Sequence, residues 1–110
     1  MRLKLYKGGM YIAMNQFRVK PGAEADFERV WRERQSYLSE VPGFESFHLL
    51  RGPVEEGAQL YASHTVWTDE PAFKAWTESD AFRKAHAQGG KTVQYLIGPP
   101  RFLGWQAVAL

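Results

Sequence analysis

The sequence contains no cysteine, which removes a large part of the chemistry open to a small protein. Without thiols the chain has no disulfide, no thiolate metal site and no cysteine nucleophile, a composition compatible with a reducing cytoplasm. Stability must come from an apolar core, and 110 residues with 45% hydrophobic and 15% aromatic content can bury one. We therefore predict one cytoplasmic domain.

Long hydrophobic runs and blocks of one charge are also missing. No segment approaches a membrane span, and the opening residues MRLKLYKGGMYIAM lack the apolar stretch and cleavage site of a signal peptide. Fourteen basic and twelve acidic residues give a net charge of only +2, and the charges are interspersed. Neither nucleic acid nor a membrane is an expected partner. No glycine-rich dinucleotide loop is present, so we expect the chain to bind neither flavin nor NAD.

Hydrophobic periodicity predicts the order strand, helix, strand, strand, helix pair, strand. The predicted strands cover residues 11–20, 44–51, 60–67 and 101–110, and the predicted helices cover residues 23–38 and 68–87. Residues 52–59 and 88–100 read as connections rich in Gly and Pro. This order is the βαββαβ pattern of the ferredoxin-like α+β fold, with helices on one face of an antiparallel sheet. The other face would be left bare, so we expect a homodimer to cover it.

The segment 68–87, TDEPAFKAWTESDAFRKAHA, carries a Trp and a His that packing alone does not require. Asp69 and Ser79 are typical N-cap residues, which predicts two short helices with a bend near Ser79. On one straight helix, Trp76 and His86 would lie about 80° apart around the axis. A bend can aim both side chains into one pocket.

Each candidate residue also has a purely structural interpretation. His86 can interact with the last carbonyls of its helix, and Trp76 can belong to the core. Asn15 interrupts the apolar face of the first strand; an unsatisfied buried amide costs about 1–3 kcal/mol, so it is held by the backbone or faces a ligand. His48 and His64 lie on predicted strands without acidic or thiol neighbours at ligand spacing, which argues against a zinc site. We interpret them as packing or interface residues.

Placed on this topology, Asn15, Trp76 and His86 resemble the triad of the IsdG-type heme-degrading monooxygenases. These enzymes belong to the antibiotic biosynthesis monooxygenase (ABM) superfamily of dimeric α+β barrels. The resemblance is carried by the stretches YIAMNQFRVKPG, VPGFESFHLLRG, HTVWTDEPAFKAW and SDAFRKAHA. It implies an ABM domain over residues 10–110, preceded by an N-terminal extension over residues 1–9.

The resemblance also implies roles for the three residues. His86 would bind heme iron as the proximal ligand and leave the opposite face open for dioxygen. Trp76 would press on the porphyrin and push it out of plane, and Asn15 would donate a hydrogen bond on the distal side. Heme would be substrate and cofactor at once, ring opening would release iron, and electrons would come from an external reductase or small reductant.

Two other classes of function share these features. A heme carrier would use the same pocket and His86 but would release heme intact. A cofactor-free ABM-type monooxygenase would place the same three residues around a quinol or polyketide substrate and would not bind heme.

Overall fold

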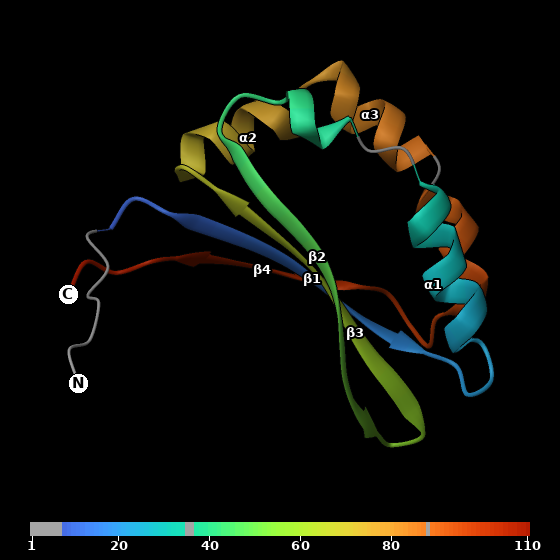
Figure 1. The fold of residues 1–110 in the computed structure, drawn as a ribbon. Helices are drawn as coiled ribbons and strands as arrows, with labels where there is room; N and C mark the ends of the chain where they lie inside the picture. Colours follow the sequence, from blue (N-terminus) through green and yellow to red (C-terminus); the bar gives the residue numbers. More distant parts are fainter. Residues whose placement is uncertain (1–7, 35–36, 88) are drawn as a thin grey trace.

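The protein forms a four-stranded antiparallel sheet with strand order β2-β3-β1-β4 in the computed structural model, which describes residues 8–34, 37–87 and 89–110. Its elements are β1 (Tyr11–Val19), α1 (Glu24–Glu33), η1 (Leu38–Glu40), β2 (Phe44–Glu55), β3 (Ala58–Trp67), α2 (Glu70–Thr77), α3 (Asp80–Ala87), η2 (Gly89–Tyr95) and β4 (Arg101–Gln106). The helices lie on one side of the sheet (Figure 1). The predicted ferredoxin-like α+β fold is confirmed. None of the helices in the described part of the chain is long and apolar enough to cross a membrane.

The alternation of side chains gives the sheet two different faces. Odd-numbered residues of β1 and β3 face the helices, and Tyr11, Phe17 and Tyr61 are buried there. The even-numbered residues of these strands point the other way, together with their register partners on β2 and β4. We call this second surface the open face. It is largely apolar, and Trp105 on β4 is 52% exposed on it.

The core beneath the helices is divided into two clusters. One cluster surrounds Trp67 and Trp76 below α2 and α3, and Leu38 is buried within it. The second surrounds Phe17 and Phe27 below α1. The sheet therefore carries two separate packed regions.

The hairpin between β2 and β3 is tighter than the sequence predicts. The strands extend to Glu55 and from Ala58, so only Glu56 and Gly57 form the turn, with φ of 49° and 78°. Two consecutive positive φ angles are typical of a type I′ hairpin turn, whose twist matches the strands. Pro53 lies within β2, which tolerates it because β2 is an edge strand with a register shift between Arg51 and Val54.

The predicted helix over residues 23–38 is too long. The helix α1 ends at Glu33, and Arg34 is extended with φ −74° and ψ 124°. Leu38 is buried, as expected for the predicted helix. It belongs to η1, however, and packs in the cluster around Trp67 and Trp76 beneath α2 and α3. Residues 35–36 lie outside the described part of the chain.

The C-terminal part also differs from expectation. Tyr11, the first residue of β1, pairs with Gln106, so the last strand ends there for lack of a partner strand and does not continue to residue 110. The connection predicted over residues 88–100 contains the 3₁₀ helix η2, followed by a bridge between Leu96 and Val19. Of the predicted N-terminal extension, residues 1–7 lie outside the described residues.

Candidate functional site

A cavity of about 670 Å³ lies between the sheet and the helices, where the two core clusters meet. Its floor comes from the strands and its walls come from α1, α2, α3 and η2. The lining is mostly apolar and aromatic, and it contains no acidic residue among those described. This volume falls within the range of about 300–1,000 Å³ that is usual for small-molecule pockets.

The bend between α2 and α3 brings Trp76 and His86 together, as predicted. The side chain of Asp69 caps α2 by accepting a hydrogen bond from the Ala72 N–H at 2.9 Å. The Ser79 hydroxyl caps α3 by accepting one from the Phe82 N–H at 3.2 Å. With this break, both rings line the cavity, and their centroids lie 5.9 Å apart.

His86 has one nitrogen engaged and one available. Its Nδ1 lies 2.9 Å from the carbonyl oxygen of Phe82, which fixes Nδ1 as the protonated donor because a carbonyl can only accept. Among the described residues, none forms a hydrogen bond with Nε2, which keeps its lone pair. The ring also stacks on Phe82 with centroids 3.9 Å apart. Burial lowers the pKa of His86 below its usual range, and the nearby charge of Arg34 acts in the same direction, so the neutral form is favoured.

Trp76 belongs both to the core and to the cavity wall. It is only 9% exposed, and its ring packs against Trp67 at 5.3 Å and edge-on against Phe82 at 4.9 Å. Its buried Nε1 has no hydrogen-bond partner within the described part of the chain. The structural interpretation of Trp76 is therefore correct in part, since the same ring forms core and lining.

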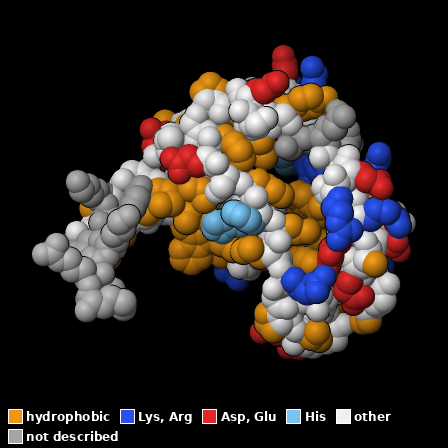
Figure 2. Space-filling model, in the orientation of Figure 1, with side chains coloured by type: hydrophobic (Ala, Val, Ile, Leu, Met, Phe, Trp, Pro, Cys, Tyr) orange, Lys and Arg blue, Asp and Glu red, His pale blue; other side chains and the backbone are white. Residues whose placement is uncertain are grey.

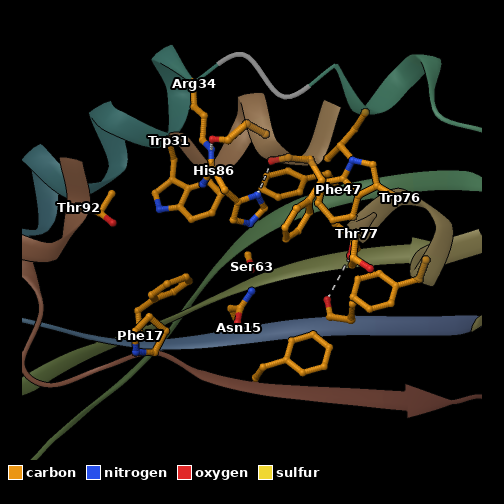
Figure 3. Close-up of a pocket in the computed structure, with 18 of the residues that line it drawn as sticks. Asn15, Phe17, Trp31, Arg34, Phe47, Ser63, Trp76, Thr77, His86 and Thr92 are labelled. Carbon is orange, nitrogen blue, oxygen red and sulfur yellow. Dashed lines mark hydrogen bonds between the residues drawn. The ribbon is translucent and has the colours of Figure 1, made fainter. Parts of the chain in front are cut away.

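Asn15 lies on the cavity floor, in register with Ser63 on β3 and Phe102 on β4. No described residue forms a hydrogen bond with its side-chain amide, so the backbone does not hold it. Figure 3 shows Asn15 pointing into the cavity from the sheet and His86 pointing into it from the helical side. A flat molecule lying between them would face an amide on one side and an imidazole on the other.

Arg34 is a cavity residue whose role the sequence did not reveal. Its guanidinium lies over the Trp31 ring, with Cζ 4.7 Å from the ring centroid, and its Nε donates to the Ala85 carbonyl at 3.2 Å. Within the described residues it has no acidic partner. Burial lowers the pKa of Arg34, but a guanidinium remains protonated. The sequence feature that could have indicated this role is the spacing of Arg34, which falls on the apolar side of the predicted helix over residues 23–38.

The other two histidines lie elsewhere. His48 and His64 pair across β2 and β3 on the open face, so the sheet separates them from the cavity. His86 is thus the one histidine of the described chain that lines the cavity.

Comparisons with known proteins agree with this fold. The sequence model described as antibiotic biosynthesis monooxygenase matches residues 10–88. A mycobilin-producing heme oxygenase of Mycobacterium tuberculosis is 36% identical over 76 residues, covering 69% of this chain and 70% of that protein. A staphylobilin-producing heme oxygenase of Staphylococcus haemolyticus is 30% identical over 87 residues, covering 76% and 79%. The crystal structure of SnoaB, a cofactor-independent oxygenase of Streptomyces nogalater, superposes with a TM-score of 0.66 at 24% identity, covering 93% and 96%.

Proposed function

Because the chain belongs to the antibiotic biosynthesis monooxygenase family, we propose that it is a heme-degrading monooxygenase that binds heme in the cavity and opens the porphyrin ring. The observation that carries this proposal is His86, which presents an unprotonated Nε2 in an apolar cavity while Nδ1 donates to the Phe82 carbonyl. Iron-ligating histidines are commonly oriented by such a hydrogen bond, which also raises the basicity of the ligating nitrogen.

The remaining cavity residues fit the chemistry of heme. Apolar and aromatic walls suit the porphyrin, whose two propionates are the charged groups that must be accommodated. Arg34 has no acidic partner among the described residues, and we assign it to one propionate. Arginine is suited to this role because its planar fork can donate two hydrogen bonds to a carboxylate.

Asn15 and Trp76 would act on the reaction more than on binding. The Asn15 amide lies on the opposite wall from His86, where it can orient dioxygen by donating a hydrogen bond. The Trp76 ring is held by its packing against Trp67 and Phe82, so it can press on a bound ring without yielding. Iron supplies the dioxygen chemistry when heme is bound, and an external reductant supplies electrons.

The first experiment is a heme titration of the heme-free protein, followed by the Soret band. We expect one heme per chain for the wild type, and loss of histidine-ligated binding for His86→Ala. His48→Ala is the matched control because it removes a histidine from the other side of the sheet. An unchanged Soret spectrum in His86→Ala would exclude His86 as the ligand. Absence of heme binding in the wild type would instead favour a cofactor-free monooxygenase.

The second experiment separates an enzyme from a carrier. Heme-loaded protein is mixed with ascorbate or a reductase under air, and decay of the Soret band is measured together with iron release. We expect both to occur within the same time course. A stable Soret band with intact heme recovered at the end would indicate a carrier.

A further inference from the structure

A second polar side chain lies on the cavity floor beside Asn15 and has no role in the site described above. Ser63 on β3 is the direct register partner of Asn15 on β1, and it lines the cavity although it is only 7% exposed. Figure 3 shows both residues on the sheet, facing His86 across the cavity. We propose that Ser63 is a second hydrogen-bond donor, which contacts dioxygen together with Asn15 when heme is bound. This inference rests on the proposed function.

The hydroxyl of Ser63 has no partner within the protein. No described residue forms a hydrogen bond with it, yet its oxygen is not sealed off, in contrast to the buried and unpaired Nε1 of Trp76. The surroundings are mainly apolar, and Figure 2 shows hydrophobic side chains gathered where the helices meet the sheet. An unpaired buried hydroxyl costs about 1–3 kcal/mol. A serine at this position therefore points to a ligand that pairs with it.

Thr65, two residues further along β3 on the same face, shows the other use of a hydroxyl on this floor. Its Oγ1 accepts a hydrogen bond from Trp67 Nε1 at 3.0 Å and donates to the Ala13 carbonyl at 3.3 Å. Both partners belong to the protein, so the Thr65 hydroxyl stabilises the core and is already occupied. The Ser63 hydroxyl has no such engagement and remains available to a ligand.

The position of Ser63 suits a second donor. Directly opposed residues of antiparallel strands have Cβ atoms about 4.5–5.5 Å apart, so the Asn15 amide and the Ser63 hydroxyl can reach the same small ligand. A hydroxyl can donate to the ligand while it accepts from the Asn15 amide, because it carries one proton and two lone pairs. Fixed donors aimed at an oxygen that gains negative charge lower the activation free energy, and two donors do so more than one.

The test uses fluoride, a small anion that binds ferric heme on the side opposite the histidine and accepts hydrogen bonds. Ferric, heme-loaded protein is titrated with fluoride, and the change of the Soret band gives the Kd. Thr and Val have nearly the same shape, so comparing Ser63→Thr with Ser63→Val isolates the hydroxyl. We expect Ser63→Thr to bind fluoride within about threefold of the wild type, and Ser63→Val to bind it about tenfold more weakly or worse, the loss of one hydrogen bond to a charged acceptor.

Two controls test whether the effect belongs to the hydroxyl. Carbon monoxide accepts hydrogen bonds only weakly, so its affinity for the ferrous heme should be equal in Ser63→Thr and Ser63→Val. Ser46→Ala is the matched control variant, because it removes a serine hydroxyl from β2 on the open face and should keep wild-type fluoride affinity. Ser63→Ala adds no atoms and should weaken fluoride binding as Ser63→Val does, which keeps the test valid even where the branched side chains disturb folding.

The possible failures are distinguishable because the heme titration is made first. Equal fluoride affinity in Ser63→Thr and Ser63→Val, or wild-type affinity in Ser63→Ala, would overturn the assignment of Ser63 and leave heme binding through His86 intact. A wild type that binds no heme would instead remove the proposed function, and the role of Ser63 with it.

Discussion

The two ring nitrogens of His86 differ in their contacts, and burial favours the neutral ring. The Phe82 carbonyl holds the proton on Nδ1, and desolvation disfavours a second proton on Nε2. A ligating nitrogen must be unprotonated, so protons compete with iron only where the pH falls below the pKa of the imidazole. Under the proposed function, the environment of His86 therefore sets the pH range in which heme binds.

We predict that heme affinity changes by less than about twofold between pH 8 and pH 6.5. The pKa of His86 is lowered from its ordinary value of 6.5, chiefly by burial, so Nε2 is still mostly unprotonated at that pH. Below the lowered pKa, affinity should fall by about tenfold for each further pH unit, because each tenfold rise in protons displaces the neutral form. Heme titrations followed by the Soret band at several pH values measure this affinity. An affinity that already declines between pH 8 and pH 7 contradicts the prediction.

Asn15 and Trp76 should affect turnover and spare binding. We expect Asn15→Ala and Trp76→Phe to retain histidine-ligated heme. Each should raise the activation free energy of heme degradation by about 2–4 kcal/mol, which slows the reaction roughly thirty- to a thousandfold. Phe is preferred to Ala at position 76, because truncating a buried Trp to Ala costs about 3–5 kcal/mol of stability. Rates of Soret decay are compared with heme affinity for each variant. Val93→Ala, at the exposed margin of the cavity, is the control expected to keep both.

Arg34 should discriminate heme from its dimethyl ester. The wild type is expected to bind the ester about tenfold more weakly, because the ester cannot accept charge-assisted hydrogen bonds from the guanidinium. Arg34→Gln should bind the two ligands equally. The control is Arg29→Gln on α1, which removes an exposed arginine whose Nη1 contacts Asp26 at 2.9 Å. Equal binding of both ligands by the wild type would refute the assignment without affecting that of His86.

At the scale of elements, α1 is fixed to the sheet by a polar cluster outside the cavity. The Glu28 carboxylate on α1 accepts hydrogen bonds from the Tyr61 hydroxyl on β3 and from Arg51 on β2. The Tyr61 hydrogen bond, and then that of Arg51, hold the pKa of Glu28 below its ordinary value of 4.5. Because α1 also carries Trp31, this cluster helps to set one wall of the cavity.

We predict that Tyr61→Phe lowers the free energy of unfolding by about 1–2 kcal/mol at pH 7. A carboxyl whose pKa is lower in the folded state contributes stability above its unfolded pKa, and this contribution disappears as the pH falls through the folded value. The cost of Tyr61→Phe should therefore be largest above pH 4.5 and shrink below it. Urea unfolding at several pH values measures this. Tyr95→Phe, whose hydroxyl has no hydrogen bond among the described residues, should cost little at any pH.

The sequence predicted the elements better than their ends. Periodicity located each strand and the break at Ser79, because alternation, helical spacing and N-cap residues are local signals. The end of α1 depends on Leu38 reaching a distant cluster, and the end of β4 depends on where β1 begins. Both are tertiary effects. The same holds for the site, since Asn15, Trp76 and His86 stood out locally, whereas Arg34 gains its significance from Trp31 and Ala85 around it.

At the scale of the whole molecule, the open face is the main unexplained surface. Helices cover one side of the sheet, and the other side presents apolar residues such as Leu50, 42% exposed, and Trp105, 52% exposed. Monomeric proteins rarely expose contiguous apolar patches larger than a few hundred Å². A second copy of the chain is a suitable cover, because a two-fold axis lets the same patch bury itself.

We therefore predict a homodimer of about 25 kDa, twice the chain mass of 12.6 kDa, by light scattering at micromolar concentration. Trp105→Glu should produce a monomer, since a carboxylate would be buried without a partner in an apolar contact. Val108→Glu is the matched control, because Val108 is 69% exposed and lies beyond the end of β4. It should remain a dimer. A wild-type monomer, or an intact Trp105→Glu dimer, would show that the open face is not the contact.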